Sequence, residues 1–130
     1  CDQSLLKKDL SKIVKKSTEI VISVCKQCGN NFLPLIFQTK NMKNALSLLN
    51  DDEEQFAFDT DAEKYFGYDE LDNKSSTTII TGPESGFSDE ELKLINNNKI
   101  KIRYLGQNIL RAETAPIFVS SIIRNQFGRI

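Results

Sequence analysis

Two glycine-bearing loops carry the residues that could hold a small ligand. The first is TGPESG at residues 81–86, directly after a β-branched run. Glycine has no Cβ, so it lets the backbone approach a flat or thin ligand closely. The second loop begins with Leu105 and Gly106 and contains the apolar pair Ile109 and Leu110. Loops usually lie on the surface, so apolar side chains in this one suggest the lining of a pocket.

Each loop also has a purely structural interpretation. The first could be a tight turn from a strand into a helix, and it lacks the G-x-x-x-x-G-K-[ST] pattern of a phosphate-binding loop. Arg111 and Glu113 follow the second loop, where they could form an ordinary salt bridge. Arginine is also the side chain best suited to phosphate forks and to flat stacking. Composition alone leaves both interpretations open.

The cysteines point away from metal and redox chemistry. Cys25 and Cys28 fit C-x-x-C, but zinc needs four ligands and the sequence has no His. A thioredoxin-like motif would follow a strand and open a helix, whereas this pair closes a helical pattern. We therefore expect no metal site. Unpaired thiols are typical of a reducing compartment, so we expect a cytoplasmic protein.

Two helices have clear end signals. A period of 3.6 residues from Leu5 to Cys28 predicts a long helix that Gly29 ends. Ser88 and Glu91 form an S-x-x-E capping box, which predicts a helix that extends to the asparagine run 96–98. Residue type predicts strands at residues 33–37, 55–58, 77–81 and 99–105, and helices at residues 41–49 and 113–127.

The order of these elements predicts an α/β fold around a parallel sheet. The β-branched strand 77–81 has the profile of a strand that is buried on both faces. The polar residues 59–75 are expected to form a loop with one helical turn. Ligands bind at the carboxyl ends of the strands in such sheets. These ends are residues 59–61, 81–87 and 105–111.

Length and charge restrict the class further. The chain has 130 residues, of which 39% are hydrophobic and 27% charged, so it can form one domain and is not a disordered chain. No apolar run approaches the ~20 residues of a membrane span. The net charge of −1 is unlike that of a dedicated nucleic-acid binder. The chain begins with Cys1, so we expect a processed chain or a piece of a longer protein.

Together, the two loops resemble a known family. TGPESGFSDEEL at residues 81–92 and YLGQNILRAETAP at residues 104–116 resemble the GPEGGFS and LGxxILRxETA motifs of the RsmE family of methyltransferases. The resemblance covers residues 10–127 and implies a parallel-sheet α/β domain of the SPOUT superfamily with a C-terminal trefoil knot. It implies a homodimer. In that family an RNA-binding barrel domain and a first strand–helix–strand precede the segment seen here, so residues 1–130 would be one partial catalytic domain.

The resemblance also implies a reaction and a site. The family transfers a methyl group from S-adenosylmethionine to ring nitrogen 3 of a uracil in small-subunit ribosomal RNA. Arg111 is the candidate for stabilising the negative charge that the ring acquires when this nitrogen loses its proton. Glu113 is the candidate for orienting Arg111 or for accepting hydrogen bonds from the substrate. The cofactor-binding residues implied by motif position are Phe58, Thr81, Gly82, Gly86, Leu105, Gly106, Ile109 and Leu110.

A departure from the family pattern at Ser85 and an alternative function accompany the resemblance. Ser85 stands where the family has Gly, which is compatible unless the backbone there needs a positive φ. The alternative is a non-catalytic dimerisation or RNA-binding module that keeps the fold and has lost turnover. Titration with S-adenosylmethionine separates the two functions.

Overall fold

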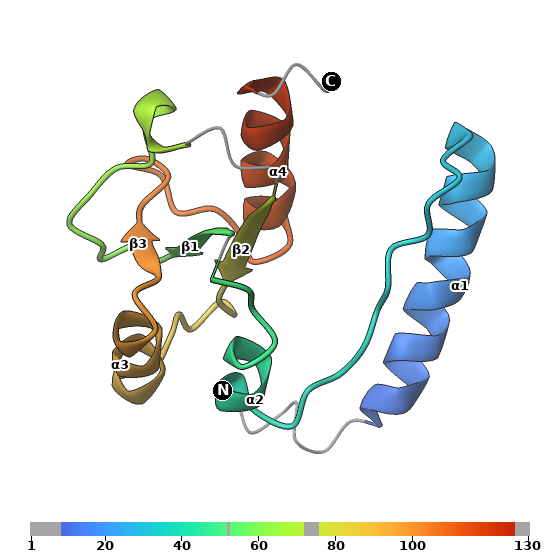
Figure 1. The fold of residues 1–130 in the computed structure, drawn as a ribbon, viewed down its shortest axis with the longest axis horizontal. Helices are drawn as coiled ribbons and strands as arrows, with labels where there is room; N and C mark the ends of the chain where they lie inside the picture. The colour runs from blue at the N-terminus through green and yellow to red at the C-terminus, as the bar shows by residue number, and fades with distance from the viewer. Residues whose placement is uncertain (1–8, 52, 72–75, 127–130) are drawn as a thin grey trace. The chain divides into compact units, whose positions relative to one another are not determined.

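The chain divides into two compact units, residues 2–41 and residues 42–130. The computed structural model describes residues 9–51, 53–71 and 76–126. Among these residues, no helix is both long and apolar enough to cross a membrane. The first unit holds α1 (Leu10–Cys28); the second holds α2 (Met42–Leu46), β1 (Glu54–Phe58), the 3₁₀ turn η1 (Tyr68–Glu70), β2 (Thr77–Thr81), α3 (Asp89–Asn97), β3 (Lys101–Arg103) and α4 (Thr114–Gln126) (Figure 1).

Helix α1 has a defined cap at each end. The Asp9 side chain accepts a hydrogen bond from the Ser11 N–H at 3.2 Å, so the helix begins at Leu10 rather than at the predicted Leu5. Leu5 itself lies outside the described residues. Gly29 has a φ of 70°, the left-handed conformation that commonly ends helices. The prediction that Gly29 ends this helix is confirmed.

The predicted strand at residues 33–37 is wrong. These residues form no strand, and the side chains of Leu35 and Phe37 are 88% and 64% exposed. A strand forms only where a neighbouring strand supplies hydrogen-bond partners. The described part of residues 2–41 contains α1 and no other regular element. Pro34 also lacks a backbone N–H, which weakens strand pairing further.

The sheet is parallel and has β1 at its centre. The strand order is β2-β1-β3, and Phe56 is opposite Ile79 on one side and Lys101 on the other. This arrangement confirms the predicted α/β class with a parallel sheet. The expectation that the strand at residues 77–81 is buried on both faces is wrong. Strand β2 is at the edge and is half-buried along its length, whereas four of the five β1 residues are buried.

Successive side chains of β1 point into two different cores, as the pleat of a strand requires. Ala57 lies in one core, with residues from α2 and α3. Phe56 and Phe58 lie in the other, where both rings make edge contacts with Phe66. Figure 1 shows α3 and α4 on opposite sides of the sheet. The two cores consist of Leu46, Ala57, Ile95 and Ile100 on one face, and Phe56, Phe58, Phe66 and Val119 on the other.

The ends of several elements differ from prediction. The Ser88–Glu91 capping box is present, and α3 ends at Asn97 as expected. The helix predicted at 41–49 ends at Leu46, and the strand predicted at 99–105 shortens to Lys101–Arg103.

Two backbone features account for the short strand Lys101–Arg103. Lys99 has a positive φ of 57°, which is incompatible with strand geometry. Tyr104 makes only an isolated bridge, with Tyr65.

Helix α4 lies where it was expected. It carries Pro116 in its first turn, as predicted, and Phe127 lies outside the described residues.

A bidentate ion pair ties the loop after β1 to β3. The Arg103 Nε and Nη2 atoms donate to the two Glu70 carboxylate oxygens at 2.7 and 3.0 Å. Both side chains are largely buried. This hydrogen bonding lowers the pKa of the Glu70 carboxyl below its usual value. The one helical turn expected within residues 59–75 is η1, and it ends with this glutamate.

The Glu70→Gln variant should have a lower free energy of unfolding, by about 1–2 kcal/mol at pH 7, because it loses a charge-assisted hydrogen bond. A lowered carboxyl pKa stabilises the fold above the ordinary Glu pKa of about 4.3, and that stabilisation disappears as the pH falls through the folded value. The difference in unfolding free energy between wild type and variant should therefore stay constant from pH 7 to about 5 and narrow as the pH falls further, to about 2. Urea unfolding at each pH measures it.

Asp69→Asn is the matched control, because Asp69 is an exposed neighbour on the same turn. Its free energy of unfolding should stay within about 0.5 kcal/mol of wild type. A Glu70→Gln deficit that is unchanged at the lower pH would contradict the assignment.

Candidate functional site

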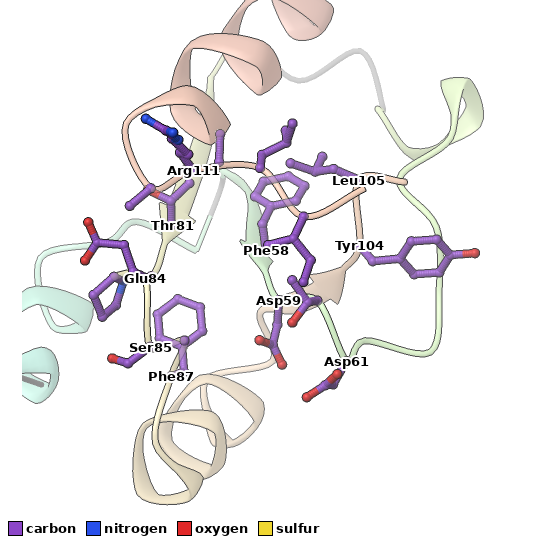
Figure 2. Close-up of a pocket in the computed structure, with 18 of the residues that line it drawn as sticks. Phe58, Asp59, Asp61, Thr81, Glu84, Ser85, Phe87, Tyr104, Leu105 and Arg111 are labelled. Atoms are coloured by element: carbon purple, nitrogen blue, oxygen red, sulfur yellow. The ribbon is translucent and has the colours of Figure 1, made fainter. Parts of the chain in front are cut away.

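The carboxyl ends of the three strands open onto one cavity of about 730 Å³ (Figure 2). Small-molecule sites are typically about 300–1,000 Å³. The loops meet here because the strands are parallel and in register, with Phe58 opposite both Thr81 and Arg103. Most of the lining comes from residues 58–61 at the end of β1, residues 81–87 at the end of β2, and residues 104–106 and 108–112 after β3.

The structure brings together most of the residues that the sequence singled out. All eight candidate cofactor-binding residues line the cavity, and Arg111 lines it with them. Glu113 does not line it, and its side chain is exposed. Among the described residues, no hydrogen bond or ion pair joins Glu113 to Arg111. The role assigned to Glu113 stays a prediction.

Apolar side chains form the walls of the cavity. Phe58 is buried at the end of β1, and Phe87 and Leu105 are half-buried. A Cβ placed on Gly82 would lie 3.4 Å from the Phe87 ring, so this glycine lets the ring pack against the loop backbone. Ile109 is 79% exposed, so it contributes a wall that a ligand would cover.

The first loop has one backbone position that requires glycine. Gly86 has a φ of +74°, and its N–H donates to the Pro83 carbonyl at 2.9 Å, which closes the turn. Ser85 is not among the described residues with positive φ. A serine is therefore compatible with the backbone at the position where the resembled family has glycine. This departure leaves the loop geometry intact.

The backbone of Arg111 is held by the start of α4, and its side chain is exposed at the cavity. Its carbonyl oxygen accepts hydrogen bonds from the N–H groups of Thr114 and Ala115 at 2.9 and 3.1 Å. In the view of Figure 2, Arg111 lies on the same side of the cavity as Thr81 and Glu84, and opposite Tyr104. The N-terminal end of a helix carries a partial positive charge, which adds to that of the guanidinium.

Five lining residues fall outside the predicted segments, one of which is Ala112, directly after the third segment. Leu92 and Ala115 belong to the first turns of the helices that follow the two loops, and Tyr104 directly follows β3. Asp89 is the first residue of α3. A helix that starts at a cavity-lining loop places its first turn beside the cavity, and this signal could have identified three of the five. Tyr104 was included in the predicted strand, which concealed it.

Comparison with known proteins identifies a family. A family model described as an RNA methyltransferase domain matches residues 1–124. A ribosomal RNA small subunit methyltransferase E from Mesomycoplasma hyopneumoniae is 32% identical over 111 residues, 85% of this chain and 48% of the relative. The same-named protein of Buchnera aphidicola from Acyrthosiphon pisum is 30% identical over 131 residues, 92% of this chain and 47% of the relative. The chain thus spans about half the length of these curated relatives.

A solved structure shares the fold. The ribosomal RNA small subunit methyltransferase E of Neisseria gonorrhoeae, crystallised with S-adenosyl methionine, superposes with a TM-score of 0.78 at 24% identity. The match covers 88% of this chain and 48% of that one. This likeness confirms the α/β fold with a parallel sheet, whereas the C-terminal knot stays a prediction.

The Gly86→Ala variant should lose about 1–2 kcal/mol of unfolding free energy, because an L-residue in the left-handed region is strained by that amount. Ser85→Ala is the matched control one residue earlier. Its side chain is exposed and its φ is not positive, so its loss should stay below about 0.5 kcal/mol. Urea unfolding measures both variants, and equal losses would contradict the assignment of the turn to Gly86.

Proposed function

The chain belongs to the RNA methyltransferase family, and from this premise we propose that its cavity binds S-adenosylmethionine for methylation of a uracil ring nitrogen in small-subunit ribosomal RNA. The observation that carries the proposal is the convergence of three strand-end loops on one cavity. Relatives named ribosomal RNA small subunit methyltransferases support the substrate class.

The described residues fit this cofactor. Adenine is flat and weakly polar, so it needs apolar walls and a few backbone hydrogen-bonding groups. Phe58, Phe87 and Leu105 supply walls, and the glycine-bearing backbone of residues 81–86 allows close approach. When bound, S-adenosylmethionine supplies an electrophilic methyl group. The main task of the protein is then to position donor and acceptor.

Arg111 is proposed to stabilise the acceptor. A uracil that has lost its N3 proton carries negative charge, and a fixed cation beside it lowers the energy of that state. Arg111 is suited to this role because its backbone is held at the α4 N-terminus and its side chain lines the cavity. Exposed Glu113 is proposed to accept hydrogen bonds from the RNA or to orient Arg111 once substrate is bound.

The domain to which these residues belong and the cellular location are also proposed. Residues 1–130 would supply the cofactor-binding part of one catalytic domain, with RNA-binding regions contributed from outside it. A cytoplasmic location is supported by the free thiols of Cys25 and Cys28, which a reducing compartment preserves.

A homodimer is proposed through the outer face of α4. Ile117 is 68% exposed and Phe118 is 42% exposed, although both are large apolar side chains. A shallow groove on this face is lined by Pro116, Ile117, Ser120, Ser121 and Arg124. Because α4 starts directly at the cavity, a second copy on this face would lie near the bound cofactor and the RNA.

The Arg111→Ala variant should lower kcat for methyl transfer to small-subunit RNA by about 10²-fold, because it removes the positive charge that is proposed to stabilise the transition state. Its affinity for S-adenosylmethionine should change less. Transfer of a radiolabelled methyl group measures the rate, and calorimetry measures the affinity. Lys93→Ala is the matched control, since it removes an exposed positive charge outside the cavity. A wild-type rate for Arg111→Ala would exclude the proposed role.

The same calorimetry separates the enzyme from the non-catalytic module. If titration with S-adenosylmethionine at high micromolar concentration produces no heat of binding while the dimer is intact, the chain is better interpreted as a non-catalytic dimerisation or RNA-binding module.

The Ile117→Asp variant should shift the protein from dimer to monomer, because it would bury an unpaired charge between two copies. Sedimentation equilibrium measures the shift. Asn125→Asp is the control, because it adds the same charge to an exposed α4 position outside the groove. Equal dimerisation of both variants would place the interface elsewhere.

A further inference from the structure

The described lining of the cavity has more acidic than basic side chains, and the role proposed for Arg111 does not account for the acidic ones. Among the described residues that line it, four are acidic, and Arg111 is the one basic residue. Three of the acids are exposed, so water and salt screen them. Asp59 is half-buried and is therefore the least screened of the four. The acidic lining residues are Asp59, Asp61, Glu84 and Asp89.

The backbone of Asp59 is held in place at the end of β1. Its N–H donates to the Arg103 carbonyl at 3.0 Å, and its own carbonyl accepts from the Ala62 N–H at 3.4 Å. The ladder between β1 and β3 thus continues one residue beyond Phe58. The side chain of Asp59 is consequently attached to backbone that the sheet holds by hydrogen bonds.

The Asp59 carboxylate faces the first glycine loop. A Cβ placed on Gly86 would lie 3.8 Å from Asp59 Oδ1. Figure 2 shows Asp59 next to Phe58 and on the side of the loop that carries Ser85 and Phe87. Within the part of the chain that the structure describes, this carboxylate has no ion-pair partner. A half-buried, unpaired charge at a cavity wall is suited to a cationic ligand.

We propose that Asp59 is a specificity-determining residue that recognises the sulfonium charge of the cofactor, an inference that rests on the function proposed above. A sulfonium has no hydrogen to donate, so the protein can recognise it only through charge and shape. Asp59 provides the charge at the meeting point of the apolar wall and the glycine turn. The demethylated product is a neutral thioether at the same position, so Asp59 favours cofactor over product.

Calorimetric titration of the full chain tests this selectivity. S-adenosylmethionine and S-adenosylhomocysteine share the adenosine and the amino acid and differ in the methyl group and charge at sulfur. Asp59→Asn should weaken S-adenosylmethionine binding by about three- to tenfold, since charge interactions in a partly dry cavity exceed those in water. The same variant should leave S-adenosylhomocysteine affinity within twofold of wild type. Glu63→Gln is the matched control, an exposed acid outside the cavity.

Each other outcome overturns the proposal in a distinguishable way. Equal weakening of both ligands by Asp59→Asn would assign the carboxylate to the shared ribose or amino group instead. Unchanged binding of both would remove Asp59 from recognition altogether. If the wild-type protein binds neither ligand, the proposed function itself fails and the role of Asp59 fails with it.

A kinetic readout separates recognition from a merely structural role. The positive charge on sulfur disappears during methyl transfer, so a carboxylate beside it stabilises the bound cofactor more than the transition state. Asp59→Asn should therefore raise KM for S-adenosylmethionine without lowering kcat. A fall in kcat with unchanged KM would contradict the proposal.

Discussion

Parallel pairing of β1 with both of its neighbours is the constraint on which the rest of the structure depends. Phe58 is opposite Thr81 in one strand and Arg103 in the other, so three chain segments leave the sheet at the same edge. The loops that follow have no other means of meeting, because they are far apart in sequence. Burial of Phe56 and Ala57 on opposite faces holds β1 in this central position.

Arg103 connects the stability of the sheet to the geometry of the cavity. Its side chain holds Glu70 and so restrains the loop after β1. Its carbonyl oxygen accepts the Asp59 N–H, which sets where the acidic wall of the cavity begins. A change in the β3 backbone would therefore be transmitted to the ligand site without any altered side chain there. The second loop is fixed in a comparable way, because hydrogen bonds to the Arg111 carbonyl initiate α4.

Local features could be predicted from the sequence, and non-local ones could not. The Ser88 cap and the Gly29 stop depend on a few adjacent residues, and both were identified. The glycine loop at 81–86 was located for the same reason. The strand predicted at 33–37 failed because pairing depends on a distant partner. The edge position of β2 and the approach of Asp59 to Gly86 also depend on how remote segments come together, so composition could not show them.

The placement of the central strand has a consequence for how the polypeptide acquires its shape during synthesis. Strand β1 precedes both of its partners, and the residue opposite Phe58 in β3 comes forty-five positions later. While the ribosome makes that stretch, the phenylalanines of β1 have no finished sheet to enter. Contacts between residues so far apart in sequence slow folding, and they leave intermediates with exposed apolar surface that are prone to aggregate. The apolar side chains of β1 are therefore the ones that wait longest for their final environment while the chain is made.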